Sequence, residues 1–141
     1  MSVYLDASAI LPLFVDEPSS DLLEAFVQRL AEPIAVSEFA AAEVAAALSR
    51  RSRMGTLTQS EAGVCLRDFD AWRASETFDP GVDAEDLRLT SRFVRRFDLA
   101  LRAPDALHVA VCLRGGHRLA TLDQCLAAAA GALGVVVIVP A

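Results

Sequence analysis

The chain contains no lysine, and all 13 of its basic residues are arginine. Phosphotransfer domains of the receiver and haloacid-dehalogenase-like kinds place a nucleophilic aspartate after their first strand, and they rely on a lysine near the phosphoryl group. The absence of lysine therefore counts strongly against an aspartyl-phosphate mechanism. Basic side-chain contacts to a phosphate, where they exist in this protein, are arginine contacts.

Cysteine and histidine are also scarce. Cys65, Cys112 and Cys125 are far apart, odd in number and form no CxxC pair, which argues against both a disulfide framework and a zinc knuckle. We expect them to be small buried apolar residues in a reducing compartment. His108 and His117 lie outside any metal-ligand spacing. We expect His108 to be a core or surface histidine, with a contact to a nearby acid as the alternative.

Neither a secretion signal nor a membrane span is predicted. The N-terminus lacks a basic stretch and has Asp6 inside its first apolar run, which is unlike a signal peptide. The uncharged segment 126–141 is interrupted by glycine and too short to cross a bilayer. With 141 residues, 54% hydrophobic and 23% charged, the chain is expected to form one packed domain over residues 1–141. We expect it to be cytoplasmic, without membrane contact.

The charge is unusual for a nucleic-acid binder, because the net value is −6. Its distribution is uneven: residues 1–43 contain eight acids and a single arginine, Arg29. Most arginines come later, in clusters over 50–53 and 88–102. They either decorate exposed helix ends, where the helix dipole favours cations, or contact phosphates. The candidate phosphate contacts are Arg50, Arg51, Arg53, Arg92, Arg95 and Arg96.

Short apolar segments alternate with amphipathic ones along the chain. The apolar pattern predicts strands over 3–5, 34–36, 118–121 and 135–139. Helices are predicted over 20–32, 37–53, from the capping box of Thr58 and Glu61 onward, 83–97, 105–113 and from 123 to about 131–134. Strands that are apolar throughout and alternate with helices indicate an α/β fold of three layers, with a parallel sheet of four or five strands flanked by helices.

Four acids are predicted at one edge of that sheet, where ligands of such folds collect. Asp6 ends the first strand, Asp123 follows the third by two residues, and Asp105 lies in the first turn of a helix. Glu43 is the single charge within the segment 39–48, and no basic residue stands three or four positions away. Taken singly, the aspartates could be helix caps or first-turn acids, and Glu43 could face solvent.

Together the four carboxylates would repel one another. At 5 Å and an effective dielectric near 20, each pair costs roughly 3 kcal/mol. Such a cluster persists by taking up protons or by binding a cation, and Mg²⁺ or Mn²⁺ suits oxygen ligands without histidine or cysteine. An ion of this kind lowers the pKa of a bound water and stabilises the attacking and leaving oxygens of a phosphodiester.

Four segments follow one another in a distinctive order and spacing: Asp6-Ala-Ser-Ala-Ile-Leu, Ser37-Glu38 leading to Glu43, Ala103-Pro104-Asp105-Ala106-Leu107-His108-Val109-Ala110, and Thr121-Leu122-Asp123. In this order and spacing they resemble the successive motifs of VapC-type PIN domains. The final Leu-Gly-Val-Val-Val-Ile-Val-Pro segment matches as well, so the resemblance spans nearly the whole chain. The strand-end aspartate combined with the Asp-Ala-Leu-His segment is the specific part of this pattern.

The resemblance implies a PIN-like fold and an endoribonuclease with a Mg²⁺ site, in which Mn²⁺ can substitute. Asp6 and Asp105 would be the primary metal ligands, and Glu43 and Asp123 would complete an acidic pocket through metal-bound water or a second ion. The hydroxyls of Ser8 and Thr121 match family positions that hydrogen-bond the acids or a phosphate. Helix capping is an equal alternative for these two hydroxyls.

The resemblance also implies partners. VapC-type proteins are the toxins of toxin–antitoxin pairs, so an RNA substrate, a cognate VapB-like antitoxin and a homodimer are expected. An acidic N-terminal region and an acidic pocket would accept a basic antitoxin tail. The arginines named above would then contact RNA. A non-enzymatic PIN-like module that only binds RNA or protein is the alternative.

Overall fold

A five-stranded parallel sheet organises the computed structural model, which describes residues 1–141. The strand order is β3-β2-β1-β4-β5, and every neighbouring pair is parallel. The strands are β1 (Val3–Leu5), β2 (Ile34–Ala35), β3 (Thr77–Phe78), β4 (Arg118–Ala120) and β5 (Val137–Ile138). The prediction of a parallel α/β sheet with four or five strands is confirmed.

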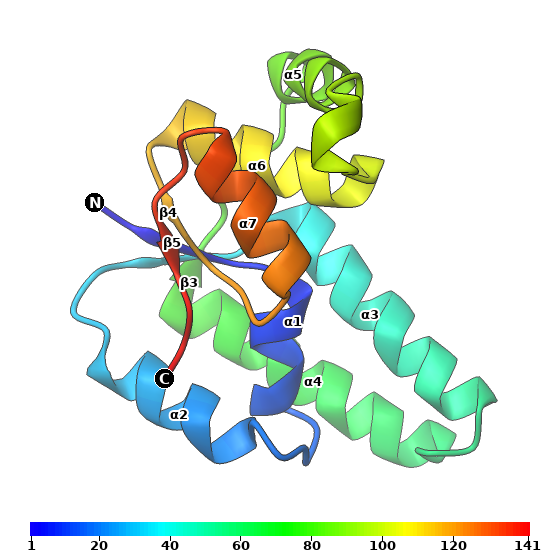
Figure 1. Ribbon diagram of the computed structural model, residues 1–141. Helices are drawn as coiled ribbons and strands as arrows, with labels where there is room; N and C mark the ends of the chain where they lie inside the picture. The colour runs from blue at the N-terminus through cyan, green and yellow to red at the C-terminus, as the bar shows by residue number, and fades with distance from the viewer.

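Helices cover both faces of the sheet (Figure 1). They are α1 (Ala7–Ile10), α2 (Ser20–Arg29), α3 (Glu38–Arg53), α4 (Gln59–Glu76), α5 (Ala84–Val94), α6 (Ala103–Gly115) and α7 (Gln124–Ala132), with 3-10 turns η1 (Leu11–Leu13) and η2 (Phe97–Leu99). Ser37 caps α3, and Thr58 with Glu61 forms the expected capping box of α4. No helix is both long and apolar enough to cross a bilayer.

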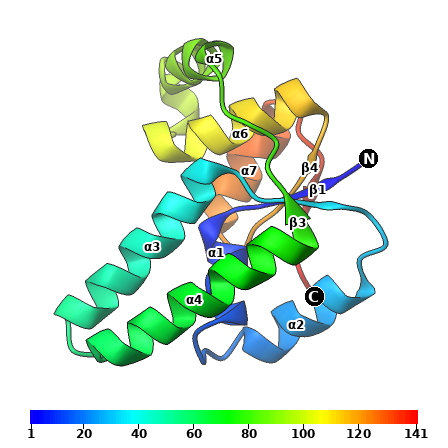
Figure 2. The ribbon, with the colours of Figure 1, turned by 180° about the vertical axis from the view of Figure 1, so that it is seen from behind.

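The alternation of side chains along β1 divides the core in two. Val3 and Leu5 pack on one face of the sheet with residues of α1 to α4, and Tyr4 packs on the other with residues of α5 to α7. Figure 2 shows α3 and α4 side by side beneath the first face. All three β1 side chains are fully buried, which explains why this strand is apolar throughout.

Several predicted elements differ from the structure: the helix predicted over 20–32 ends at Arg29, and the strand predicted over 135–139 is confined to Val137–Ile138. The strand β3 was not predicted, because two residues directly after α4 show no periodicity of their own. The helix predicted over 83–97 ends at Val94, and the chain continues through η2 to Ala100, whose φ of 50° is left-handed. The helix predicted over 105–113 spans Ala103–Gly115 and ends at Gly116, which has a φ of 68°.

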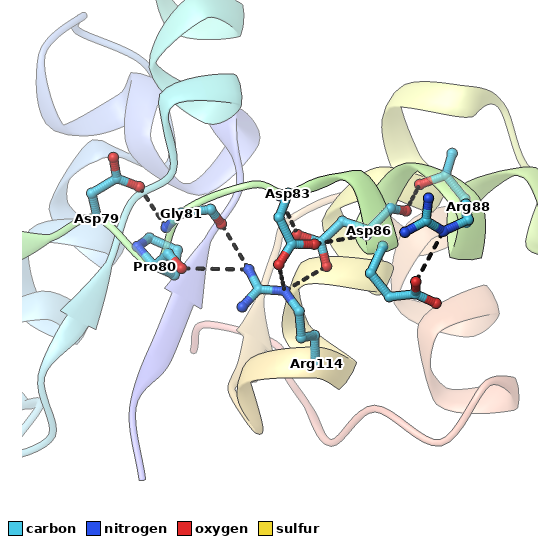
Figure 3. A network of polar contacts seen from close by, with 9 residues as sticks. Asp79, Pro80, Gly81, Asp83, Asp86, Arg88 and Arg114 are labelled. Carbon is cyan, nitrogen blue, oxygen red and sulfur yellow. Dashed lines mark hydrogen bonds and ion pairs between the residues drawn. The ribbon is translucent and has the colours of Figure 1, made fainter.

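An ion-pair network fixes α5 against α6 (Figure 3). Nε of Arg114 lies 2.7 Å from Oδ1 of the buried Asp86, and NH2 donates to the carbonyl of Gly81 at 2.9 Å. Asp83 and Asp86 also form the capping box that begins α5. The network therefore holds the first turn of α5 on the last turn of α6, and the short connection through η2 returns the chain to the first turn of α6.

Candidate active site

The parallel register of β1 and β4 brings the first site residues together. Leu5 pairs with Ala120 at the carboxyl ends of the two strands. The next residue on each strand, Asp6 on one and Thr121 on the other, therefore lies at the same edge of the sheet. Asp6 is also the N-cap of α1, and Asp123 is the N-cap of α7. The sequence prediction that both acids follow strands at one edge is confirmed.

Asp6 is almost fully buried, with 5% of its surface exposed. The Ser8 hydroxyl donates to its Oδ1 at 2.8 Å, and the Thr121 hydroxyl donates to its Oδ2 at 2.9 Å. The backbone N–H of Ala9 also donates to Oδ1, at 3.3 Å. Burial raises the pKa of Asp6 above its ordinary value, although the hydroxyls of Ser8 and Thr121 and the nearby His108 lower it in part. The carboxylate is thus fixed in direction and costly to charge without a cation.

The hydroxyls of Ser8 and Thr121 connect this acid to the start of α7. Ser8 Oγ accepts from the backbone N–H of Leu122 at 3.0 Å, and Thr121 Oγ1 accepts from that of Asp123 at 3.0 Å. Asp123 in turn accepts from the N–H of Leu126 at 3.0 Å. Neither hydroxyl is a helix cap, so the capping alternative for Ser8 and Thr121 is wrong.

Asp105 lies in the first turn of α6, with its side chain partly exposed. Burial raises its pKa; the neighbouring Arg102 lowers it, and the charges of Asp123 and Glu43 raise it further. The Arg102 guanidinium is 3.6 Å from Asp105 Oδ2. Because charge–charge effects weaken with distance, the influence of Asp123 and Glu43 on the pKa of Asp105 indicates that these three carboxylates form one acidic cluster, the acidic pocket of this fold.

Glu43 enters the pocket from the second turn of α3, through a contact that the sequence analysis did not favour. Its Oε1 lies 2.5 Å from Nε2 of His108, and Nδ1 of the same ring lies 2.6 Å from the Tyr4 hydroxyl. His108 is 2% exposed, so the expectation of a core histidine is confirmed, but it also contacts a site acid. The position of His108, one helical turn after Asp105, is the feature of the sequence that could have indicated this contact. Ser37 was predicted as a helix cap but not as a partner of Tyr4, and the hydroxyls of these two residues lie 2.8 Å apart.

The candidate arginines lie at the C-terminal ends of α3 and α5, where the helix dipole favours cations. One group forms the last turn of α3, where Arg51 pairs with Glu17. Another lies around the end of α5, where Arg96 pairs with Asp98. The sequence analysis left Arg102 out of its candidate contacts, yet it is the arginine that pairs with a pocket acid. The structure places the candidates in these two groups: Arg50, Arg51 and Arg53; Arg92, Arg95 and Arg96.

The donor set of the pocket suits a hard divalent cation. No three histidine, cysteine or carboxylate groups converge closely enough to form a metal cage on their own. Mg²⁺ does not need such a cage, since it keeps several waters and binds through one or two carboxylates plus substrate phosphate. A cation would also offset the cost of charging Asp6 and Asp105, both of whose pKa values are raised by burial. The residues present therefore fit such an ion.

Comparison with known proteins agrees with this architecture. The family model described as "PIN domain" matches residues 3–132. Ribonuclease VapC46 of Mycobacterium tuberculosis is 34% identical over 142 residues, covering 99% of this chain and 98% of the relative. Ribonuclease VapC3 of Pyrobaculum aerophilum is 32% identical over 127 residues, covering 90% and 93%.

Two solved structures share the fold at low identity. One is Mycobacterium tuberculosis VapC20, a sarcin-ricin loop cleaving toxin, with a TM-score of 0.73, 17% identity and coverage of 95% of this chain and 96% of that one. The other is VapBC2 of Rickettsia felis bound to a promoter DNA fragment, with a TM-score of 0.68, 12% identity and 98% coverage of both chains. The fold and its acidic pocket define a PIN domain. The chain belongs to this family and, within it, to the VapC type.

Proposed function

We propose that this protein is a Mg²⁺-dependent endoribonuclease and the toxin of a VapBC-type toxin–antitoxin pair. The observation that supports the activity best is the fixed carboxylate of Asp6, which hydroxyl groups hold at both oxygens at the edge of the sheet where β1 and β4 end. Relatives named ribonuclease VapC, which align along nearly the whole chain, support the same conclusion.

Asp6 and Asp105 are the residues that would hold the ion. Mg²⁺, when bound, supplies positive charge at the scissile phosphate and lowers the pKa of water. Ser8 and Thr121 keep both oxygens of Asp6 in place, so the carboxylate need not reorient during the reaction. Glu43 and Asp123 orient the attacking water and accept its proton, or help to hold a second ion.

The arginines near the pocket would hold the RNA backbone. Arg102 is 78% exposed beside Asp105, and the end of α5 places Arg92 and Arg95 on the segment that leads into α6. Arginine pairs with phosphate oxygens through two parallel hydrogen bonds and needs no lysine beside it. This group compensates locally for a chain whose net charge is −6.

The partners we propose are an RNA substrate, a VapB-like antitoxin and a second copy of the chain. A solved structure that shares this fold carries the name VapBC2, which is the type of pair proposed here. An acidic pocket and an acidic N-terminal region complement a basic antitoxin segment, which would compete with the metal and the RNA for the pocket.

The first test is cleavage of a mixed RNA pool by the purified protein with Mg²⁺, with Mn²⁺ and with EDTA. Asp105→Asn removes one proposed ligand, and Glu24→Gln changes an exposed carboxylate on α2 as a matched control. Cleavage by the wild type and the control, lost in EDTA and in Asp105→Asn, is the expected result. A folded wild type that cuts no RNA with either metal would refute the nuclease and favour a binding module.

A further inference from the structure

A buried chain of hydrogen bonds ends on Glu43. It starts at the N-cap of α3, where Ser37 Oγ accepts from the backbone N–H of Ala40 at 3.0 Å. The Ser37 hydroxyl lies 2.8 Å from that of Tyr4, which lies 2.6 Å from Nδ1 of His108. Nε2 of His108 then reaches Oε1 of Glu43 at 2.5 Å. Polar groups this deep in a core are expensive unless each has a partner, so a complete chain of them needs an explanation.

One set of proton positions satisfies every group in the chain. Ser37 accepts from Ala40 and donates to Tyr4; the Tyr4 phenol donates to Nδ1 of His108; and Nε2–H donates to Glu43. Burial raises the pKa of Tyr4 well above its ordinary value, so the phenol remains a donor. In the reverse direction, with Nδ1–H donating to Tyr4 and Tyr4 donating to Ser37, the Ser37 proton has no acceptor. The geometry therefore selects the histidine tautomer with its proton on Nε2.

Packing fixes the ring as well as its protons. Phe39 and Glu43 are four residues apart on α3, so they lie on the same face of that helix. The Phe39 ring centroid is 5.3 Å from that of His108, and the Tyr4 centroid is 5.5 Å away on another side. With two aromatic neighbours and a hydrogen bond at each nitrogen, the imidazole has a single orientation toward α3.

We propose that His108, supported by Tyr4 and Ser37, is a positioning residue that holds Oε1 of Glu43 and so fixes the direction of this carboxylate toward the pocket. The inference rests on the proposed function. Oε2 has no hydrogen-bond partner within the protein, and the Glu43 side chain is 31% exposed. Oε2 is thus the oxygen of Glu43 that is free of protein hydrogen bonds and open to a water or ion.

Two substitutions of His108 that differ by one methylene group distinguish a role in positioning Glu43 from a role in packing alone. His108→Gln places an amide N–H as many bonds from Cα as Nε2 of histidine, so it can still donate to Glu43. His108→Asn is equally polar but too short to reach. Tyr4→Phe, which removes the donor to Nδ1 and the acceptor of the Ser37 hydroxyl, is an independent third variant. Thermal unfolding checks that each variant is folded.

Two readouts are measured on all three variants: Mn²⁺ affinity without RNA, by titration calorimetry, and kcat and KM for RNA cleavage. We expect His108→Asn to lower Mn²⁺ affinity or kcat about 10–100-fold, the usual effect of losing a partner of a metal-site carboxylate, with KM within about twofold. His108→Gln should recover most of the loss, and Tyr4→Phe should fall between the two.

Equal Mn²⁺ affinities and equal kcat values in the Asn and Gln variants would overturn the inference. A wild type that binds Mn²⁺ but cuts no RNA would refute the proposed function alone; the Mn²⁺ affinities of the two variants would then still decide whether His108 positions Glu43. A wild type that cuts RNA, with no difference between the variants, would refute the positioning role alone.

Discussion

The hydroxyl of Thr121 donates to Oδ2 of Asp6 at 2.9 Å, although the two residues are 115 positions apart in the chain. The parallel pairing of β1 with β4 produces this contact, because it places the ends of the two strands side by side. Asp6 therefore depends on a residue of another strand for its orientation, and the stability of the pocket depends on the register of the sheet.

Replacing Thr121 by valine tests this dependence. Valine keeps the branched shape but leaves Oδ2 of a buried carboxylate without its donor, which costs about 1–3 kcal/mol in the free energy of unfolding. We expect nuclease activity to fall about 10–100-fold, because the direction of Asp6 toward the ion is no longer fixed. Urea unfolding and cleavage rates measure the two effects. A variant with wild-type cleavage would show that the hydroxyl is dispensable.

The metal-free protein should become less stable as pH rises above about 4, because of the raised pKa values of Asp6 and Asp105. The pKa values of Asp6 and Asp105 are raised in the folded state, so the folded protein binds more protons than the unfolded one. Their stabilising effect is complete below the ordinary carboxyl pKa and is lost as pH rises from about 4 through the raised values. Urea unfolding in EDTA at several pH values should show this loss.

Added Mg²⁺ should oppose that loss, more strongly at higher pH, because the ion binds the charged carboxylates of the folded state. Asp105→Asn removes one of the two carboxyl groups and should make the dependence on pH shallower. A metal-free wild type that becomes more stable as pH rises over the same range would contradict the assignment of these two acids.

The arginines near α6 should contribute to RNA binding through phosphates. RNA binding is measured in the catalytically inactive Asp105→Asn variant, so that the RNA is not cut. Adding Arg92→Gln or Arg95→Gln to this variant should weaken its affinity for RNA. Each should also reduce the slope of log affinity against log salt by about 0.7, the value for one single-strand phosphate contact. Arg88→Gln is the matched control on the same helix, since Arg88 is exposed and already paired with Glu85. Unchanged salt slopes in both test variants would remove these arginines from the RNA interface.

The ion pair of Arg114 with Asp86 should contribute to stability far more than that of Arg88 with Glu85, although the acid of each pair lies on α5. The Asp86 side chain is 0% exposed, whereas those of Arg88 and Glu85 are 65% and 59% exposed. Arg114→Met leaves a buried carboxylate without its charged donor and should cost about 2 kcal/mol. Arg88→Met should cost about 0.5 kcal/mol or less. Thermal or urea unfolding compares them, and equal losses would contradict the structural role of the network.

Much of this protein was predictable from local sequence. Apolar strands alternating with helices indicated a parallel sheet because burial on both faces requires apolar residues at every strand position. Asp6 and Asp105 were predicted at a strand end and in a first helical turn, and the structure has Asp6 directly after β1 and Asp105 in the first turn of α6. Caps such as Ser37 and Thr58 were also correct, since capping depends on a few adjacent residues.

Tertiary structure alone decided the rest. The strand β3 exists because β2 pairs with Thr77 and Phe78, and two residues show no periodicity without that partner. The contacts of Ser8 and Thr121 with Asp6, and of Tyr4 and His108 with Glu43, join residues from distant segments. Local sequence determines which residues can cap, turn or become buried. Only the packing of helices on both faces of the sheet determines which polar side chains meet, because those distances depend on the whole fold.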